Sequence, residues 1–259
     1  MAYETIDYVV ADHIARITLN RPAARNALSD AMVEELLDAF SRVKADTEAR
    51  VVVLTGAGEK AFCAGADLSG MGRTQAGGGS VADSAVFRLF TAVPGLGKPI
   101  IARLAGHALA GGLGLAVSCD LVIAADDVKL GTPEVNVGLW PMMIMAIINR
   151  NIAPKQAFKL YYTGQPISAR EGAQIGLVTE AVPRAELDTR VDELARTIAA
   201  KSPIGLAMGR AAFFAIEGRP LEDQVGYLLD QLVVLAGTAD AKEGVAAFLE
   251  KRPPRFTGL

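Results

Sequence analysis

The run from Arg50 to Thr55 (RVVVLT) constrains the fold most, because it is a short, unbroken apolar stretch closed by Gly56. A strand of this kind is apolar on both faces, so it needs a covering layer on each side, as in a parallel sheet. The stretch 13–20 (HIARITLN) alternates imperfectly and is rich in β-branched residues, which predicts another strand. Between the two strands, Ser29 is placed to cap a helix. The order strand, helix, strand predicts an α/β layer architecture.

This alternation continues through the first half of the chain and then stops. Apolar runs predict strands at 99–104, 121–125 and 128–131, and helices are expected at 82–93, 115–118 and 141–149. Ser168 and Glu171 have the spacing of a capping box at a further helix start. Ser202, Pro220 and Thr238 mark three more helix starts, so the last third is expected to be nearly all helix.

Charge and composition exclude several classes of protein. The 26 basic and 29 acidic residues leave a net charge of −3, which gives no electrostatic footprint for nucleic acid. A hydrophobic fraction of 51% excludes a disordered chain. Two cysteines, Cys63 and Cys119, cannot build a disulfide framework, and the acidic N-terminal stretch lacks the apolar core of a signal peptide. Glycines and Asp120 interrupt the longest apolar stretch, 104–125, whereas a bilayer span takes about 20 consecutive apolar residues. We therefore expect a cytoplasmic protein.

Two segments rich in small residues could bring a ligand close to the backbone. The first, 61–68 (AFCAGADL), follows a predicted strand, and an ordinary tight connection would explain it equally well. The second, 106–115 (GHALAGGLGL), is a glycine cluster at a helix start, where free N–H groups and the helix dipole favour negative charge. It has neither the Walker ending nor the dinucleotide-binding spacing. Close packing of a helix on a strand remains an alternative for this cluster.

The third segment, 131–141 (GTPEVNVGLWP), holds a single carboxylate, Glu134, in an otherwise uncharged stretch. Apolar surroundings raise the pKa of a carboxyl group, which suits proton transfer near neutral pH. The alternative is a solvent-exposed loop glutamate.

Together these segments resemble the crotonase superfamily, also called the enoyl-CoA hydratase/isomerase family, over nearly the whole chain. The resemblance is carried by Asn20-Arg21-Pro22, Asn26-Ala27-Leu28, the 62–68 loop, Lys98-Pro99-Ile100-Ile101-Ala102, the 106–116 turn, Cys119-Asp120, Pro133-Glu134 and the tail 248–256. It implies a ClpP/crotonase-like spiral of ββα units followed by helices that mediate trimers, often paired as hexamers. On this basis residues 1–200 would form the core with the CoA thioester site, and 201–259 the region for oligomerisation.

The resemblance also implies roles for single residues. Family members bind coenzyme A thioesters and hold the thioester oxygen with two backbone N–H groups as it becomes an enolate. The matching positions are Ala66 and Gly111, which would form an oxyanion hole. The CoA body would lie along the 64–68 loop, which makes Ala64, Asp67 and Leu68 candidate substrate-binding residues.

Basic residues toward the CoA phosphates are also implied. Arg25 stands where members often place one, and Lys251 and Arg252 in the tail could reach the phosphates of a neighbouring subunit. For all three side chains a solvated surface position is the alternative.

One departure from the family pattern bears on the reaction. Family hydratases add water with two glutamates; one matches Glu134, and the other falls on Gly114, which has no side chain to ionise. Because a general acid or base is worth about 10²–10⁴-fold in rate, this favours double-bond isomerisation of an enoyl-CoA, with Glu134 as the sole acid/base moving a proton from C2 to C4. Two alternatives stay open: hydration (a lyase reaction) with one glutamate or an acid from another loop, and a non-catalytic acyl-CoA-binding protein.

A second departure is the run Met142-Met143-Ile144-Met145, where hydratases usually have small residues. Methionine fills irregular apolar space, so Met142 with Leu139 and Trp140 is expected to line an acyl pocket with little room for water. The alternative is plain helix core.

The remaining ionisable residues are expected to be structural. Asp67 and Asp120 would fix loops or cap helices, and His107 would be a satisfied structural histidine. The two histidines and two cysteines are scattered, so no metal site is expected. No cofactor is expected either, because coenzyme A enters as part of the substrate.

Overall fold

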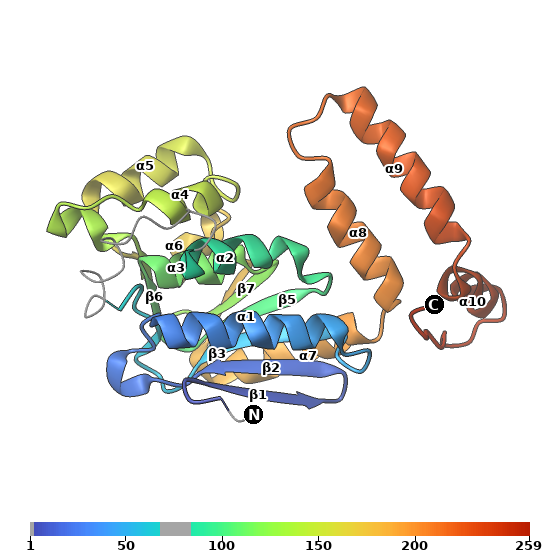
Figure 1. Cartoon of the computed structure of the whole chain (residues 1–259), viewed down its shortest axis with the longest axis horizontal. Coiled ribbons are helices and arrows are strands. Elements are labelled where there is room, and N and C mark those ends of the chain that lie inside the picture. The colour runs from blue at the N-terminus through green and yellow to red at the C-terminus, as the bar shows by residue number, and fades with distance from the viewer. Residues whose placement is uncertain (1–2, 68–83) are drawn as a thin grey trace.

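The computed structural model describes residues 3–67 and 84–259, in which helices enclose two sheets (Figure 1). The larger sheet has six strands, which in spatial order are β1 (Ile6–Ala11), β2 (Ile14–Leu19), β3 (Val51–Gly56), β5 (Ile100–Leu104), β7 (Leu121–Ala125) and β10 (Glu180–Val182). β1 and β2 pair antiparallel, and every later pair is parallel. The smaller sheet has the order β4 (Ala61–Cys63), β6 (His107–Leu109), β8 (Lys129–Gly131) and β9 (Ile167–Ser168).

Helices follow or separate these strands. The α-helices are α1 (Asp30–Ala45), α2 (Ala85–Ala92), α3 (Gly111–Ser118), α4 (Met142–Ile148), α5 (Pro154–Thr163), α6 (Ala169–Gln174), α7 (Leu187–Ala199), α8 (Pro203–Ala215), α9 (Leu221–Ala236) and α10 (Ala239–Leu249). Short 3₁₀ helices are η1 (Pro22–Ala24), η3 (Pro94–Leu96), η4 (Pro133–Val137) and η5 (Arg184–Glu186). None of the helices within residues 3–67 and 84–259 is both long and apolar enough to cross a bilayer.

A repeated strand–strand–helix unit generates both sheets. β3, β5 and β7 lie side by side in the larger sheet, and each is followed by a short strand of the smaller sheet: β4, β6 and β8 in turn. Helices α2 and α3 complete the first two units, and η4 with α4 completes the third. The chain therefore advances by one strand in each sheet at every turn, which is the spiral of ββα units that the resemblance implied.

The central strand and the first long helix form where the sequence predicts them. Every residue of β3 is buried, in agreement with its unbroken apolar run. The Ser29 side chain accepts a hydrogen bond from Met32 N at 3.3 Å and so caps α1. The apolar face of α1 is buried in the core that it shares with β1 and β2.

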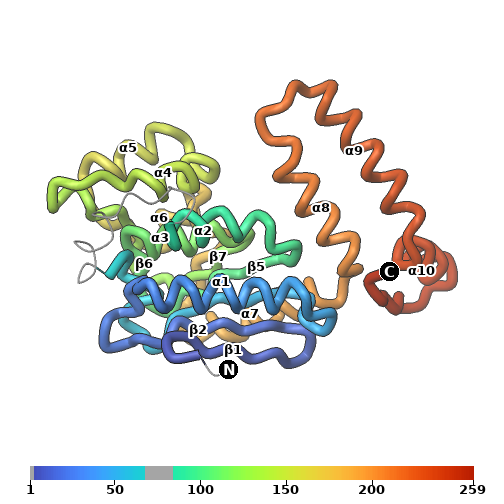
Figure 2. The backbone as a smooth tube through the Cα atoms, viewed as in Figure 1, coloured from blue at the N-terminus to red at the C-terminus, as the bar shows by residue number. Residues whose placement is uncertain are grey.

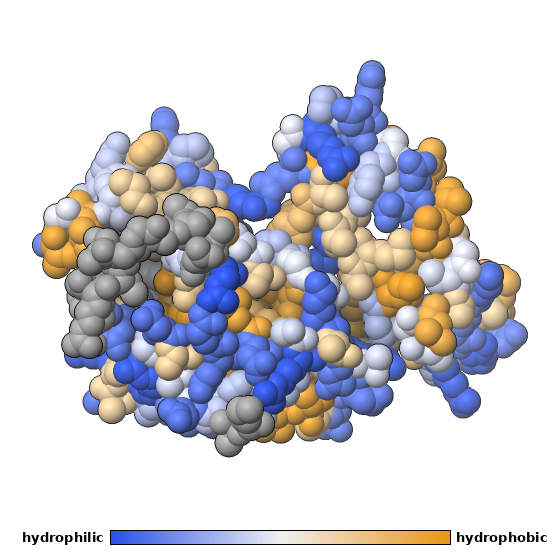
Figure 3. Space-filling view, viewed as in Figure 1, coloured by the Kyte–Doolittle hydropathy of each residue, from blue (hydrophilic) through white to orange (hydrophobic). Residues whose placement is uncertain are grey.

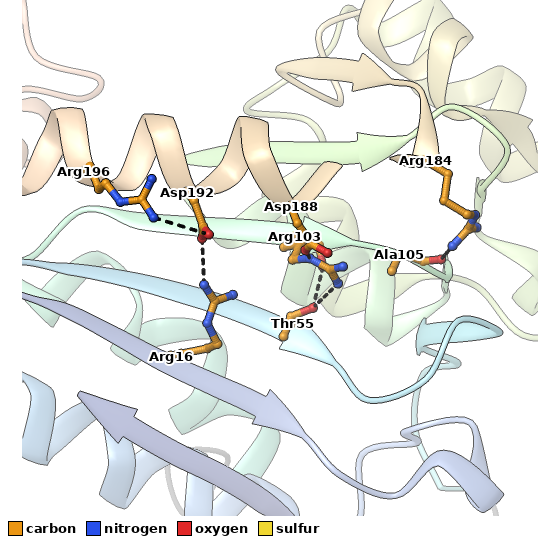
Figure 4. Close-up of polar contacts among 8 residues, drawn as sticks. All are labelled: Arg16, Thr55, Arg103, Ala105, Arg184, Asp188, Asp192 and Arg196. Atoms are coloured by element: carbon orange, nitrogen blue, oxygen red, sulfur yellow. Dashed lines mark hydrogen bonds and ion pairs between the residues drawn. The ribbon is translucent and has the colours of Figure 1, made fainter. Parts of the chain in front are cut away.

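Helix α7 covers the face of the larger sheet opposite α1 (Figures 1 and 4). Arg16 on β2 donates to Asp192 at 2.9 Å, and Arg103 on β5 donates to Asp188 at 2.6 Å. The Thr55 hydroxyl of β3 lies beside Arg103 and donates to its carbonyl at 3.0 Å. The first two bonds fix α7 to β2 and β5, and the third joins β3 to β5 beneath it.

After α7 the chain leaves the two sheets. Helices α8 and α9 form a hairpin that projects away from them, and α10 lies at the open end of this hairpin, opposite the α8–α9 turn and beside the C-terminus (Figures 1 and 2). Arg210, only 8% exposed at its side chain, joins α8 to the core by donating to Asp120 at 2.8 Å and to the carbonyls of Val93 and Pro94. The domain boundary at residues 200/201 stays a prediction.

Candidate active site

The three segments singled out in the sequence emerge at one edge of the smaller sheet. β4 pairs with β6 in parallel, and β6 pairs with β8 in parallel. The residues that follow these strands, at 64–67, 110–114 and 132–134, therefore leave from the same ends of adjacent strands. The carboxyl ends of parallel strands are where α/β proteins build their ligand sites.

Ala66 and Gly111 lie beside one another where their segments leave the smaller sheet. A Cβ built on Gly111 would lie 3.7 Å from Ala66 N. Leu28 N donates to Gly65 O at 2.8 Å and Asp67 N donates to Leu28 O at 2.9 Å, so in this parallel bridge the Ala66 amide points away from Leu28. Gly111 begins α3, where a helix leaves its first N–H groups without an internal acceptor. Within the described chain, neither amide donates a hydrogen bond. They are therefore available to an incoming oxygen atom.

Unusual backbone angles hold this turn. Gly65 has φ +103°, and a Cβ there would lie 2.8 Å from the Ala110 Cβ, so only glycine fits. Ala110 itself has φ +50° and ψ −131°, a sparsely populated conformation for a residue with a side chain. Its N–H donates to Gly131 O at 2.9 Å. The strained turn redirects the chain from β6 into α3 and places the Gly111 amide at the edge.

Asn26 explains the Asn26-Ala27-Leu28 motif. Its side chain is fully buried, and its Nδ2 donates to Ala57 O at 3.0 Å and Ala61 O at 2.9 Å. Its Oδ1 accepts from Arg21 N at 3.0 Å. The amide thus holds the 21–28 segment against both ends of the β3–β4 connection, which brings Leu28 beside Ala66. The motif was recognised from the sequence, but the hydrogen bonds that explain its asparagine are visible only in the structure.

The residues expected along the CoA body lie near one another. Ala64 N donates to the Arg25 carbonyl at 3.1 Å, and Arg25 is exposed with a left-handed backbone (φ +52°). The carboxylate of Asp67 accepts two hydrogen bonds of 3.0 Å from the Arg21 guanidinium, so it fixes the loop as expected. Leu68 lies outside the described residues. Contact of these residues with CoA stays a prediction.

The basic residues of the tail lie at the other end of the chain. Lys251 and Arg252 follow α10, in the part of the molecule that projects from the sheets (Figure 2). The Arg252 guanidinium donates to Glu243 and Glu250, and this pairing lowers the pKa of Glu243 to about 2. Their proposed contact with the phosphates of a neighbouring subunit stays a prediction.

Glu134 is the titratable side chain of the third segment. It lies in η4, directly after β8, and burial raises its pKa above the ordinary value of 4.5. Its Oε2 atom is buried and has no hydrogen-bond partner among the described residues, and the same holds for the hydroxyl of Thr132. A buried carboxylate oxygen without a hydrogen-bond donor lowers the stability of the folded protein, and a bound ligand can supply that donor. These properties suit a group that accepts and returns a proton.

The position of the missing second acid is occupied by other side chains. Gly114 lies on α3, three residues after Gly111. A Cβ at 114 would overlap Ile144 Cγ2 and would lie 2.8 Å from Ile144 Cβ and 3.3 Å from Phe90 Cε1. Neither Ile144 nor Phe90 was expected at this position from the sequence. All seven residues of α4 are apolar, so its sequence carries no signal of which face packs inward, and the structure buries Ile144 and Ile148.

The candidate acyl-pocket residues are largely solvent-facing. Leu139 is 50% exposed and Met142 is 66% exposed. Trp140 is half-buried, and its ring packs against Tyr161 and Tyr162 with centroids 5.6 and 5.7 Å away. A role for these three residues in an acyl pocket stays a prediction.

The other motif residues have structural partners. Asp120 accepts hydrogen bonds from Ile100 N and from Arg210. His107 is exposed, and its Nδ1 accepts a hydrogen bond from Lys129 N at 3.0 Å, which ties β6 to β8. In the described ranges no three or more His, Cys, Asp or Glu side chains gather in a way that could hold a metal ion.

Comparison with known proteins shows the family of this chain. The family profile described as enoyl-CoA hydratase/isomerase matches residues 10–259. The crotonyl-CoA hydratase of Syntrophomonas wolfei is 35% identical over 259 residues, which cover 99% of both chains. The (E)-benzylidenesuccinyl-CoA hydratase of Thauera aromatica is 37% identical over 254 residues, 96% of this chain and 97% of that one. The crystal structure of an enoyl-CoA hydratase from Mycobacterium smegmatis superposes with a TM-score of 0.91 at 34% identity, covering 98% of this chain and 99% of that one. The chain therefore belongs to the enoyl-CoA hydratase/isomerase family of the crotonase superfamily.

Proposed function

We propose that this protein shifts the double bond of an enoyl-CoA thioester, with Glu134 as the sole acid/base. The observation that carries the proposal is the single carboxylate. Glu134 has a raised pKa and a buried oxygen without a partner, whereas position 114 offers no second acid and is filled by Ile144 and Phe90. Moving a proton between two carbons needs one carboxylate, whereas adding water in the manner of family hydratases uses two.

In the proposed reaction the thioester oxygen accepts hydrogen bonds from the amides of Ala66 and Gly111. Glu134 removes a proton from C2 of a 3-enoyl-CoA, and the electron pair of the C–H bond enters a dienolate whose negative charge rests largely on that oxygen. The protonated Glu134 then delivers the same proton to C4, which leaves a 2-enoyl-CoA. Atoms and charge balance without water or an added cofactor.

The two amides and the carboxyl group contribute in different ways. Each amide stabilises charge that develops in the transition state, and losing one such donor costs roughly 2.7–4 kcal/mol. The dipole of α3 adds to the Gly111 amide at the helix start. Burial makes Glu134 a stronger base than an exposed glutamate and gives it a protonated form that persists nearer neutral pH.

Glu134→Gln tests the proposal. We expect double-bond shift in 3-enoyl-CoA to fall by about 10²–10⁴-fold, the usual worth of a general acid/base, while affinity for a saturated thioester such as butanoyl-CoA is retained. Product chromatography and calorimetric titration measure the two quantities. If no substrate in a panel of enoyl-CoA thioesters shows a reaction that this change removes, a non-catalytic acyl-CoA-binding role replaces the proposal.

Hydration is the second candidate, because the curated relatives at 35 and 37% identity are named as hydratases of CoA thioesters. In this reading Glu134 alone, or with an acid from another loop, would add water to a 2-enoyl-CoA. Incubating the protein separately with 2-enoyl-CoA and 3-enoyl-CoA distinguishes the two reactions. Fast hydration without any double-bond shift would favour hydration over isomerisation.

We also propose a homotrimer or a dimer of trimers. None of the α9 residues is buried against the rest of the described chain. Most of its large apolar side chains are exposed, namely Leu221, Val225, Leu228, Leu229, Leu232, Val233 and Val234. Hydrophobic residues gather along α9 on the face shown in Figure 3, and an apolar surface of this kind is typical of a subunit interface. Light scattering on the purified protein tests this, and a monomer at micromolar concentration would contradict it.

A cytoplasmic location is part of the same proposal. Cys63 and Cys119 are free and buried, and burial raises the pKa of the Cys63 thiol to about 12. Reduced thiols of this kind agree with a reducing compartment.

A further inference from the structure

Position 114 faces the proposed thioester site because of its place on α3. Gly111 and Gly114 are three residues apart, so they share one face of the helix. The Cα–Cβ bonds of an α-helix tilt toward its N-terminus, so a side chain at 114 would lean toward Gly111. A carboxylate at this position would therefore be carried toward the amides of Gly111 and Ala66.

The hollow that Gly114 leaves is filled from a different part of the chain. Ile144, on α4, is 3% exposed, and a Cβ at 114 would overlap its Cγ2 and lie 2.8 Å from its Cβ. Phe90 Cε1 lies 3.3 Å from the same point. The overlapping atoms of Ile144 sit at its branch point, close to the backbone, and a β-branched side chain has few alternative rotamers. Room for a side chain at 114 therefore requires Ile144 to lose its Cγ2 atom, and the remaining contact of 2.8 Å with its Cβ, which alanine keeps, to be relieved by a small shift of α4.

The filled hollow also affects water. Its lining atoms nearest to position 114 are carbon atoms of Ile144 and Phe90. An ordered water needs two to four polar partners, and a small apolar space stays dry. Ile144 thus removes both a place for a second acid and a place for the water that such an acid would bind.

We infer that Ile144 is a specificity-determining residue. By occupying the hollow at Gly114, its side chain restricts the site to reactions that need only one carboxylate. This inference rests on the proposed function. Its consequence is that restoring a glutamate at 114 is not sufficient to create a two-carboxylate hydratase, because the glutamate and Ile144 compete for the same space. Both positions must change together.

The test compares Gly114→Glu, Ile144→Ala and the double variant. Ile148→Ala is the matched control, because Ile148 is a fully buried isoleucine one turn further along α4. Each protein is assayed with 2-enoyl-CoA for hydration and with 3-enoyl-CoA for double-bond shift, and butanoyl-CoA binding is measured by calorimetry. We expect the double variant to hydrate 2-enoyl-CoA about 10²-fold faster than either single variant, the lower bound for a general acid/base. Ile148→Ala should leave the ratio of hydration to double-bond shift unchanged.

A second measurement does not depend on activity. Gly114→Ala introduces only a methyl group into the hollow, so it should lower the melting temperature in the native background. Beside Ile144→Ala it should lower it by less, because the overlap with Cγ2 is gone and only the 2.8 Å contact with Ile144 Cβ and the 3.3 Å contact with Phe90 Cε1 remain. If Gly114→Ala lowered the melting temperature equally in the two backgrounds, Ile144 would not be the residue that fills the space beside position 114, and the inference would be overturned.

Two activity results would also overturn it: a folded Gly114→Glu variant that hydrates as fast as the double variant, or a double variant that binds butanoyl-CoA without any gain in hydration. Failure of the proposed function is a separate result. It would be seen in the unsubstituted protein, as fast hydration without double-bond shift, and it leaves the comparison among the variants intact.

Discussion

Two adjacent glycines at the start of α3 have different neighbours, so replacing each by alanine separates catalysis from packing. A Cβ on Gly111 would lie 3.7 Å from Ala66 N and 3.8 Å from Leu28 Cδ1, which is ordinary contact. A Cβ on Gly112 would overlap the carbonyl oxygen of Cys63 and lie 2.6 Å from its carbonyl carbon. The first change therefore fits the fold, and the second requires β4 or α3 to shift.

The expected magnitudes differ accordingly. Overpacking costs about 1–3 kcal/mol and occasionally more, and the backbone of β4 yields less easily than a side chain, so Gly112→Ala should lie at the upper end. Gly111→Ala should leave stability unchanged or raise it, because alanine is preferred to glycine inside a helix by roughly 0.5–1 kcal/mol. Its methyl group would, however, stand beside the Ala66 amide, where the thioester oxygen has to approach. If one donor is lost, double-bond shift slows by about 10²–10³-fold.

Denaturant unfolding and steady-state kinetics of the two variants check this pair of expectations. The native protein is the reference for both, and each variant is the control for the other because the positions are neighbours. A Gly111→Ala protein with native activity would refute the oxyanion-hole assignment. A Gly112→Ala protein with the native denaturation midpoint would refute the packing argument.

One pH profile and three further substitutions have outcomes that follow from the structure. Since burial raises the pKa of Glu134 above 4.5, kcat/KM for double-bond shift should fall as the pH drops through that raised pKa. Glu134→Gln should raise the melting temperature at pH 7, because the folded protein then holds a charged carboxylate that burial disfavours. The gain should vanish below pH 4.5, where the carboxyl group is protonated in the folded and the unfolded protein alike. A difference in melting temperature that stays constant across pH would contradict this. Arg210→Met should cost about 1–3 kcal/mol in urea unfolding, because it removes one donor each from the Asp120 carboxylate and from the carbonyls of Val93 and Pro94, and an unchanged midpoint would show that α8 is held by other contacts. Asn26→Asp keeps the oxygen that accepts from Arg21 N but removes both side-chain N–H donors. It should therefore lower the free energy of unfolding by roughly 1–3 kcal/mol and weaken butanoyl-CoA binding in calorimetry. Native values for both quantities would exclude Asn26 as the support of the 21–28 segment.

Local signals in the sequence predicted much of the scaffold. The apolar run before Gly56 forms the fully buried β3, and the helix starts marked by Ser202, Pro220 and Thr238 are those of α8, α9 and α10. Each of these features depends on a few consecutive residues. The strands β4, β9 and β10 have only two or three residues each, which is too short for periodicity to reveal them.

The parts of the site that could not be predicted depend on contacts between distant residues. Gly114 was identified as the place of a missing acid, but the side chain that fills it, Ile144, comes from another helix thirty residues later. The methionines of α4 were expected to be core or pocket lining, yet the buried positions of that helix are Ile144 and Ile148, four residues apart, while Met142 and Met143 are exposed. Which face of a short, uniformly apolar helix turns inward is decided by its neighbours, not by its own composition.

The advance of the chain by one strand in each sheet per turn also bears on how such a protein can change its chemistry. The strands pair through their backbones. Their register therefore does not depend on the side chains at the rim of the smaller sheet, where the segments that follow β4, β6 and β8 leave the strands. Each turn contributes one short stretch to that rim, and the stretches contact one another there at a few positions, such as Gly65 with Ala110 and Ala110 with Gly131. New reactions can therefore arise from exchanges at a handful of rim positions, with the framework beneath left as it is.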